Sequence, residues 1–215
     1  MSLLNRTMFK LRNGLFMLSF TSILSRIGIE FKPYFLFLEG LKGAREPEIK
    51  GNLSEYRCEL LGADDMHTLD LTIKDFNAQR KIEVLEKGEI CIGLKHNDRV
   101  VSLMWIGCDE FTYGSTYRKL KNNEAWLAAM HTIDSYRGRN LAPYLRYKSY
   151  ELLRDMGRDV LYSASEYFNS PAIKFKEKLN ARKLKLIFYC RFFNRFLWSF
   201  TIRTYPAMKS IADNS

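Results

Sequence analysis

The sequence lacks any apolar run long enough to cross a membrane as a helix. Its longest candidate is Gly14–Leu24 (GLFMLSFTSIL), which has eleven residues and includes two serines and a threonine. A membrane-spanning helix needs about 20 predominantly apolar residues. The stretch also lacks the small-residue cleavage site that ends a secretory signal peptide. We therefore expect a soluble protein of the cytoplasm.

Cysteine and histidine are scarce, and neither residue type is grouped. The four cysteines form no Cys-x-x-Cys pair, and the three histidines are far apart in the sequence. This spacing matches no common zinc motif and no disulfide framework. We expect no metal site, and cysteines that act as small core residues in a reducing compartment. The residues concerned are Cys58, Cys91, Cys108, Cys190, His67, His96 and His131.

Acidic residues are outnumbered, with 24 Asp and Glu against 34 Lys and Arg, which gives a formal net charge of +10. A basic protein attracts an anionic partner, such as nucleic acid, a lipid surface or a phosphorylated small molecule. The charges are scattered rather than blocked, and no nucleic-acid-binding module is recognisable. We therefore expect no nucleic-acid partner.

The chain does have enough apolar residues, 47% of 215, to bury a full core in one domain. Leu11–Ile27 has the spacing of an amphipathic helix, and an extended aromatic segment follows it. The polar stretch Lys42–Glu55 predicts a linker. We divide the chain into an N-terminal extension (1–50), a main domain (51–207) and a frayed tail (208–215).

Strand and helix patterns alternate after the linker. The order is strand, helices, three strands, helix, strand, helix and two strands, which predicts a mixed α/β sheet whose antiparallel part comes first. The polar HNDR segment predicts a short hairpin turn. The predicted strands are Tyr56–Leu61, Glu89–Lys95, Arg99–Cys108, Glu124–Ile133, Asp159–Ser165, Arg182–Phe193 and Phe196–Tyr205, and the predicted helices lie within Asp64–Leu85 and at Leu141–Met156 and Ser170–Leu179.

The segment SYRGRN lies between a predicted strand and a predicted helix. Asn140 is suited to cap the helix, and Pro143 falls in the first turn, where its missing N–H costs nothing. The free N–H groups and the dipole of a helix N-terminus attract anions. Arg137 and Arg139 add positive charge, and Gly138 lets the backbone come close to a ligand. The segment predicts a phosphate or pyrophosphate site; an ordinary capped helix with two solvated arginines is the alternative.

Two motifs resemble those of the GNAT superfamily, the CoA-dependent N-acyltransferases. The stretch YRGRNLAPYL is similar to the family's acyl-CoA loop, Arg/Gln-x-x-Gly-x-Gly/Ala, with Arg137 and Ala142 at its ends and Asn140 in place of the middle glycine. The predicted element order from about residue 56 to residue 205 also fits. A second stretch, NSPAIKFKEKLNARK, resembles the family's Asn-x-x-Ala helix at Asn169, Ala172, Lys178 and Leu179.

The resemblance implies a fold and a co-substrate. The fold would be a mixed, mostly antiparallel sheet splayed at a cofactor cleft and flanked by helices, with an extra N-terminal helix-strand segment. The co-substrate would be acetyl-CoA or another acyl-CoA, with Asn169 beside its pantetheine arm. The other residues that the resemblance assigns to cofactor binding are Met130, Thr132, Ile133, Arg137, Gly138, Arg139, Asn140, Leu141 and Ala142.

Two residues of the strand before the loop are candidates for the general base. Glu124 lies thirteen residues before Arg137, which resembles the placement of the glutamate base in the histone-acetylating branch of the family. His131 is the second candidate, acting through water. The two side chains face opposite ways unless a bulge intervenes, as it often does in this family. We favour Glu124, with a pKa raised by burial; an exposed glutamate and a packed, hydrogen-bonded histidine are the alternatives.

The general acid is harder to assign. Many GNAT proteins have a tyrosine on the second helix, where this sequence has Lys176. Lys176 would protonate the leaving thiolate if burial lowered its pKa; a plain surface lysine is the alternative. Tyr162 and Tyr167 are substitutes nearby in the sequence.

Two functions remain open at this point. The first is an N-acyltransferase that moves an acetyl or other acyl group from acyl-CoA to a primary amine of a small molecule such as an amino sugar. The second is a non-catalytic GNAT-like module that binds acyl-CoA or an anionic membrane surface. In either case we expect the N-terminal extension to pack near the acceptor cleft or against a second subunit in a homodimer. The less favoured alternative is that its helix contacts a membrane surface beside the aromatic-basic stretch RFFNRFLWSF.

Overall fold

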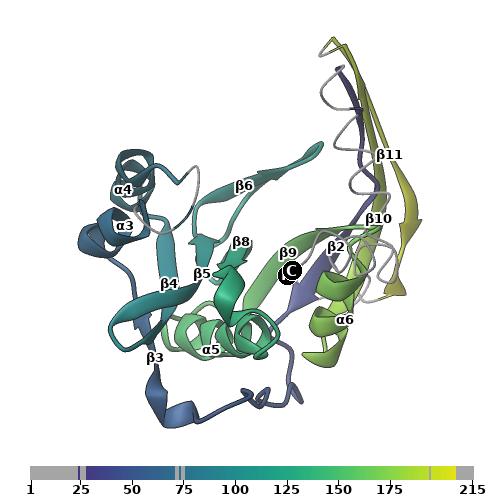
Figure 1. Cartoon of the computed structure of the whole chain (residues 1–215). Coiled ribbons are helices and arrows are strands. Elements are labelled where there is room, and N and C mark those ends of the chain that lie inside the picture. Colours follow the sequence, from purple (N-terminus) through teal and green to yellow (C-terminus); the bar gives the residue numbers. More distant parts are fainter. Residues whose placement is uncertain (1–23, 25–27, 71–72, 74–75, 194, 207–215) are drawn as a thin grey trace, which may run out of the picture. The chain divides into compact units, whose positions relative to one another are not determined.

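The computed structural model describes residues 24, 28–70, 73, 76–193 and 195–206 (Figure 1). The predicted helix Leu11–Ile27, apart from position 24, and the predicted frayed tail fall outside these residues. The chain forms two compact units. Unit 1 comprises residues 1–41, 112–117 and 163–215, and unit 2 comprises residues 42–111 and 118–162.

Unit 2 is built on a sheet in the order β3, β4, β5, β8, β9. Neighbouring strands are antiparallel except for β8 and β9, which are parallel. The predicted mixed, mostly antiparallel sheet is therefore confirmed. Its strands are β3 (Tyr56–Leu60), β4 (Ile90–His96), β5 (Arg99–Gly107), β8 (Glu124–Thr132) and β9 (Val160–Glu166), the last of which continues into unit 1.

The predicted hairpin turn between β4 and β5 is also confirmed. Asn97 and Asp98 occupy its two central positions with φ of 49° and 60°. A two-residue turn with both φ angles positive matches the twist of the strands it joins, and Asn and Asp tolerate this conformation better than other side chains do. The turn thereby sets the register of β4 against β5.

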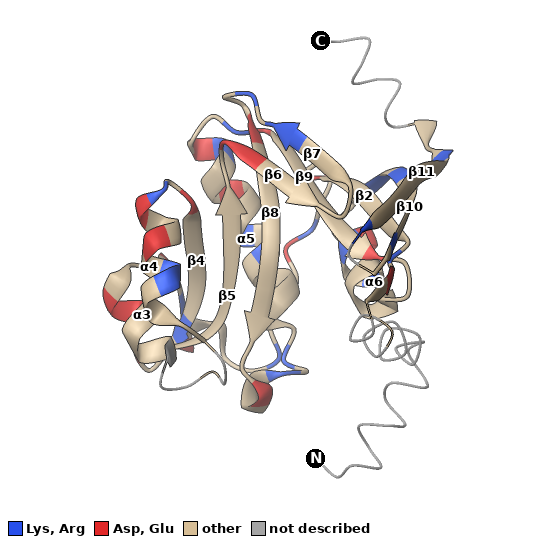
Figure 2. Cartoon of the chain, turned by 90° about the horizontal axis from the view of Figure 1, so that it is seen from above, with Lys and Arg blue, Asp and Glu red and all other residues tan. Residues whose placement is uncertain are grey.

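Helices cover both faces of the unit 2 sheet (Figure 2). Helices α3 (Ala63–Asp70) and α4 (Ala78–Glu86) pack on the face that carries Leu103 and Trp105 of β5. Helix α5 (Leu141–Asp155) packs on the other face, where its Arg146 contacts the Met104 sulfur. Because successive strand residues point to opposite faces, β5 is apolar along almost its whole length and is buried from both sides.

Strand β8 contains a bulge. Between the same two paired positions, β8 has one residue more than β5. This extra residue reverses which side chains of β8 point to which face of the sheet in the part of the strand that follows the bulge. Glu124 and His131 therefore lie on the same face of the sheet. The register pairs are Met104↔Met130 and Ile106↔Leu127.

Unit 1 combines strands from the two ends of the chain. Figure 1 shows the purple strand β2 alongside the yellow-green strand β10. Strand β2 pairs with the first part of β10, and β1 pairs with its last part. Strand β11 also pairs with β10, and all three pairings are antiparallel. The strand order places β2 between β10 and β9. The elements are β1 (Ile29–Phe31), β2 (Tyr34–Glu39), α6 (Ser170–Lys178), β10 (Arg182–Phe192) and β11 (Phe196–Thr204).

Several elements were not predicted from the sequence. Residues 29–39 were expected as the extended, strand-forming part of the N-terminal segment, and they form strands β1 and β2; the pairing of these strands with β10 was not predicted. The boundary at residue 50 stays a prediction, although unit 1 joins residues 1–41 to the C-terminal strands. The unpredicted elements are β6 (Glu110–Tyr113), β7 (Thr116–Lys119) and the 3₁₀ turns η1 (Leu53–Glu55) and η2 (Asp134–Tyr136).

A polar cluster lies in the core of unit 1. Glu39 of β2 is 0% exposed and Lys176 of α6 is 2% exposed, and their charged groups lie 3.5 Å apart. The ammonium also donates to the Ser163 hydroxyl at 2.7 Å and to the Ala164 carbonyl at 2.8 Å. The Ser163 hydroxyl in turn bonds the Glu39 carboxylate. A buried charge is tolerated only when it is paired and hydrogen-bonded, as both charges are here.

We predict that Glu39→Leu lowers the free energy of unfolding by about 3–5 kcal/mol, because it leaves the Lys176 ammonium buried without its counter-ion. The double variant Glu39→Leu/Lys176→Met should recover much of this loss. Urea denaturation of the parent, the variants Glu39→Leu and Lys176→Met, and the double variant measures the coupling energy between the two side chains. The matched control is the exposed pair Lys183–Glu177, 2.7 Å apart, whose removal should cost under about 1 kcal/mol. Equal costs for the two pairs would contradict the structural role of the cluster.

Candidate functional site

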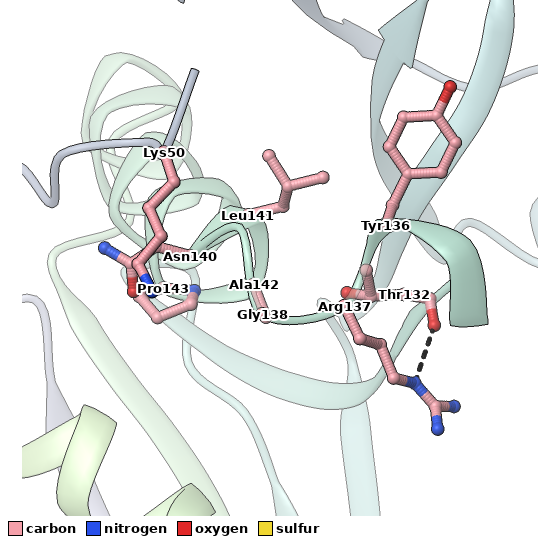
Figure 3. A pocket seen from close by; sticks show the side chains of 9 residues that line it. All are labelled: Lys50, Thr132, Tyr136, Arg137, Gly138, Asn140, Leu141, Ala142 and Pro143. Atoms are coloured by element: carbon pink, nitrogen blue, oxygen red, sulfur yellow. Dashed lines mark hydrogen bonds between the residues drawn. The ribbon is translucent and has the colours of Figure 1, made fainter. Parts of the chain in front are cut away.

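A pocket of about 280 Å³ lies at the N-terminus of α5, within unit 2 (Figure 3). The chain reaches it from the end of β8 through the 3₁₀ turn η2 and a short loop. The position of the helix start at Leu141, with Asn140 as the preceding N-cap residue, agrees with the sequence prediction. The lining residues are Lys50, Thr132, Tyr136, Arg137, Gly138, Asn140, Leu141, Ala142 and Pro143.

The backbone of this loop presents unused hydrogen-bond donors. Among the described residues, no acceptor is bound to the backbone N–H of any position from Gly138 to Ala142. The N–H of Arg137, by contrast, donates to the Asp134 carbonyl. Consecutive free N–H groups at the positive end of a helix dipole form an anion site. Each such donor gains a partner when an anion with several oxygens binds.

Asn140 departs from the expected capping geometry. Its side chain makes no hydrogen bond to the helix, and its backbone is left-handed, with φ of 66°. The side-chain amide instead donates to the Glu48 carbonyl at 2.6 Å. Asparagine is one of the few residues other than glycine that tolerate this conformation. Asn140 can therefore occupy the position of the family's middle glycine without losing the turn.

Lys50 is a pocket residue that the sequence analysis missed. Its N–H donates to the Arg139 carbonyl at 3.0 Å, and its side chain lies beside Asn140 in Figure 3. Together with the contact to Glu48, this bond fixes part of the predicted linker against the loop. The linker is polar with glycine and proline, and nothing in that composition distinguishes a segment that packs from one that is free.

The two loop arginines are held in different ways. Arg137 donates from Nε to the Thr132 carbonyl at 3.2 Å, the dashed line in Figure 3, and pairs with Asp134 at 2.8 Å. Arg139 lies over the Tyr136 ring, 4.7 Å from its centroid. It also donates to the Tyr56 hydroxyl at 3.4 Å. Both residues are solvent-exposed.

The end of β8 has an edge that β5 does not use. Strand β9 pairs in parallel with Glu124–Trp126, at the start of β8. After the bulge, the register pairs residues of β8 with β5. The N–H of Ile133 donates to the Val101 carbonyl. Backbone groups alternate in direction along a strand, so Met130 and Thr132 direct theirs to the opposite edge. Of the residues expected to bind a cofactor through the backbone, Ile133 thus has its N–H already engaged.

Glu124, our first candidate for the base, is bound on several sides. Its side chain is 4% exposed, and Arg118 donates to it at 2.5 Å. The N–H of Lys121 donates at 3.0 Å and the hydroxyl of Tyr162 at 3.2 Å. Burial alone would raise the pKa of the carboxyl, but the Lys121 N–H and the Arg118 guanidinium outweigh it and hold the pKa below 4.5. The expected upward shift is therefore wrong, and the base role of Glu124 stays a prediction.

His131 has a different environment. Its side chain is half-buried, opposite Leu103 in the register of β5, on the sheet face that α3 and α4 cover. Among the described residues no hydrogen bond to the imidazole is present. Burial and the nearby charge of Arg137 hold the pKa of His131 below its usual 6.5. The ring is therefore largely neutral at pH 7, as a proton acceptor must be.

Two of the three candidates for a general acid, Lys176 and Tyr162, are engaged by other side chains. Lys176 is buried in the cluster with Glu39, so the surface-lysine alternative is wrong. The Tyr162 hydroxyl donates to Glu124, and burial, chiefly, raises its pKa to about 12. Tyr167 is exposed and stacks on Phe35 at 5.4 Å.

Asn169, expected beside the pantetheine arm, is the N-cap of α6 in unit 1. Its side chain accepts a hydrogen bond from the Ala172 N–H at 3.2 Å. The capping bond explains why an asparagine precedes this helix. The cofactor role of Asn169 therefore stays a prediction.

Two further searches bear on the function. Among the described residues, no group of three or more His, Cys, Asp or Glu side chains is placed to hold a metal ion. No helix in the described part of the chain has the length and apolar character to span a membrane.

We predict that Glu124→Gln lowers the free energy of unfolding by about 1–3 kcal/mol at pH 7, because donors placed for a carboxylate lose their charged acceptor. The folded-state pKa is lowered, so this contribution is full above pH 4.5 and is lost as the pH falls through the folded pKa. The variant and the parent should therefore converge in acid. Denaturation from pH 3 to pH 8 tests this, with exposed Glu83→Gln on α4 as the control. A pH-independent difference would contradict the ionised carboxylate.

No protein-family model matches the chain, and no curated protein matches it in sequence. Solved structures do match. A putative GNAT-family acetyltransferase from Novosphingobium aromaticivorans superposes with a TM-score of 0.50 at 19% identity, over 76% of this chain and 66% of that one. A GNAT-family acetyltransferase from Colwellia psychrerythraea gives 0.54 at 14% identity, over 81% and 62%.

A third match is the GCN5-related glucosamine N-acetyltransferase region of a fungal multi-domain GH3 β-N-acetylglucosaminidase. Its TM-score is 0.56 at 11% identity, over 80% of this chain and 22% of that one. The chain thus spans less than two thirds of the length of each of these three proteins. Taken with the strand order and the loop between β8 and α5, the superpositions establish that this chain has the fold of the GNAT superfamily of acetyltransferases.

Proposed function

We propose that this protein is an N-acyltransferase that moves an acetyl or other acyl group from acyl-CoA to a primary amine of a small molecule. One observation carries the proposal: the run of free backbone N–H groups from Gly138 to Ala142 at the start of α5. The structural neighbours are acetyltransferases of the same fold, which supports acyl transfer as the general activity.

The residues of the pocket fit an acyl-CoA. The free N–H groups and the helix dipole suit a pyrophosphate, and Arg137 and Lys50, which line the pocket, supply positive charge around it. The backbone of Met130, which points away from β5, suits an extended chain with amide groups, such as pantetheine, whereas the Thr132 carbonyl already accepts from Arg137. When bound, acyl-CoA would supply an activated thioester, so the protein's own tasks are to position the amine and to remove its proton.

We assign proton removal to His131 rather than to Glu124. An amine attacks only as the free base, and its proton must pass to a group that is neutral at the working pH. The lowered pKa of His131 meets this requirement. Glu124 faces the same side of the sheet, but its carboxylate already accepts from three residues. Its role is to hold β8, on which His131 stands.

An amino sugar is the acceptor class that we favour. The fungal neighbour is named as a glucosamine N-acetyltransferase region. An amino sugar carries one primary amine and several hydroxyl groups. The proposal for the acceptor does not depend on the proposal for the cofactor. The latter rests on a pocket whose lining residues all belong to unit 2.

A non-catalytic module that binds acyl-CoA is the second candidate. The observation that favours it is that two of the three candidate acids are engaged: Lys176 with Glu39, and Tyr162 with Glu124. A thiolate, however, is a good enough leaving group to depart without a protein acid near neutral pH, since an ordinary thiol has a pKa of about 8.5. Release of free thiol from acetyl-CoA with a panel of amines, glucosamine included, separates the two candidates.

We predict that Arg137→Glu and Gly138→Val each weaken acetyl-CoA binding at least about tenfold by calorimetry. The first reverses a charge beside the expected pyrophosphate. The second places a branched side chain at a φ of 81°, which only glycine adopts without strain. The matched control is Arg154→Glu, at the exposed C-terminal end of the same helix. Unchanged affinity in both loop variants, with the fold intact, would contradict the site.

We predict that His131→Gln lowers kcat about a hundredfold or more, with little change in acetyl-CoA affinity. In the parent protein, kcat should fall as the pH drops through a value below 6.5, because protonated His131 accepts no proton. NMR titration of the imidazole in the free protein measures that pKa independently.

Glu124→Gln is the matched control for this experiment. This variant should keep most of the parent's kcat, and its kcat should fall over the same pH range as that of the parent. If Glu124→Gln abolishes turnover while His131→Gln leaves it normal, the base is Glu124. If both variants turn over normally, the protein contributes proximity and orientation alone.

A further inference from the structure

Strand β11 is exposed to a degree that is unusual for so apolar a strand. All nine of its residues are exposed, and five of them are large and apolar. Trp198 is 72% exposed, Phe196 62% and Phe200 55%. β11 pairs with β10 and lies off the path of the other strands. An apolar edge strand left in water promotes aggregation, so such strands are normally covered.

The pairing of β10 with β11 gathers aromatic side chains on one side of the hairpin. Directly opposed residues share a face, as do residues two apart on one strand. Phe188 stacks on Phe200 with ring centroids 5.0 Å apart and meets Phe31 of β1 edge-on at 4.8 Å. We call this group the aromatic face: Phe31, Phe188, Phe192, Phe196, Trp198 and Phe200.

The hairpin is also strongly basic. Between Glu177 and Asp213 the sequence has no acidic residue, and Figure 2 shows blue but no red along β11. Arg195 at the turn and Arg203 near the end of β11 flank the aromatic face. The Lys and Arg residues of the hairpin strands and turn are Arg182, Lys183, Lys185, Arg191, Arg195 and Arg203.

The chain that leads into the aromatic face has the same composition. The Gly28 carbonyl accepts a hydrogen bond from the N–H of Phe193, the residue that follows β10, at 2.6 Å. Residues 1–27 therefore join the structure next to the hairpin turn. They contain four Lys and Arg residues, no Asp or Glu, and many Leu, Ile, Phe and Met residues.

We propose that the aromatic face and its flanking arginines bind the surface of a membrane that contains anionic phospholipids. Aromatic side chains partition into the interfacial layer of a bilayer, and Lys and Arg are attracted by anionic headgroups. This proposal goes beyond acyl transfer and does not depend on it.

Two other partners fit the surface less well. A second copy would bring two acid-free basic hairpins together, with like charges facing each other. Single-stranded nucleic acid would use the rings for stacking, but Leu197 on the opposite side of β11 is 52% exposed and Ile202 is 51% exposed. Aliphatic side chains offer no ring for stacking, whereas they can enter the interfacial layer of a bilayer.

The test is flotation of the full-length protein with vesicles of phosphatidylcholine alone or with 30% phosphatidylserine. We expect flotation with the anionic vesicles at 100 mM NaCl and its loss at high salt. Trp198 serves as a reporter, because Trp105 and Trp126 are buried, at 5% and 7% exposure. Its emission should shift to the blue on binding and be quenched by spin-labelled lipids.

The variants separate apolar from electrostatic contributions. Phe196→Thr/Trp198→Thr and Arg195→Gln/Arg203→Gln should each lower the apparent lipid affinity about tenfold or more. The matched control is Leu53→Thr/Leu60→Thr, which removes two exposed apolar side chains of unit 2, 47% and 59% exposed, and should change nothing. Thermal melting of all variants verifies that they fold.

Three results would overturn the proposal. The first is the absence of flotation with anionic vesicles. The second is flotation that persists in both hairpin variants. The third is a hairpin-dependent dimer in sedimentation, or hairpin-dependent binding of a single-stranded oligonucleotide, without vesicle binding.

Discussion

The carboxylate of Glu124 joins three separate parts of unit 2. It accepts hydrogen bonds from Arg118 of β7, from the turn at Lys121 and from Tyr162 of β9. Glu124 is also the first residue in the parallel pairing of β8 with β9. The start of β8 is thus fixed by charge and by the backbone at one point.

The loop illustrates how a cationic binding site can be assembled without burying charge. Arg137 and Arg139 remain exposed, each held by a backbone carbonyl, a carboxylate or an aromatic ring. The part that is costly to leave unpaired is the backbone itself, with its free N–H groups. A ligand with several anionic oxygens satisfies these donors and is attracted by the arginines, so affinity and orientation come from different groups.

Features set by local chemistry were predictable from the sequence. The turn at Asn97 and Asp98, the start of α5 after Asn140 and the order of strands in unit 2 follow from turn residues, caps and periodicity. Features that depend on distant contacts were not. The burial of Lys176 against Glu39 and the hydrogen bond of Tyr162 to Glu124 join residues far apart in the chain. Lys50 belongs to the same class, because only the folded loop gives it a neighbour. Arg118 and Lys121, which reversed the expected pKa shift of Glu124, are near it in sequence but lie on the unpredicted strand β7 and in the segment that follows it.

The place of β2 has a consequence for how the chain folds. This strand is complete early in synthesis, yet its partner β10 is about 150 residues away, from Tyr34–Glu39 to Arg182–Ile187. Unit 2, by contrast, draws on residues 42–111 and 118–162. Long-range pairing is slow because loop-closure entropy is lost before contacts form. On the ribosome, β2 and its buried aromatic residues therefore stay unpaired until its neighbours β9 and β10 have been synthesised.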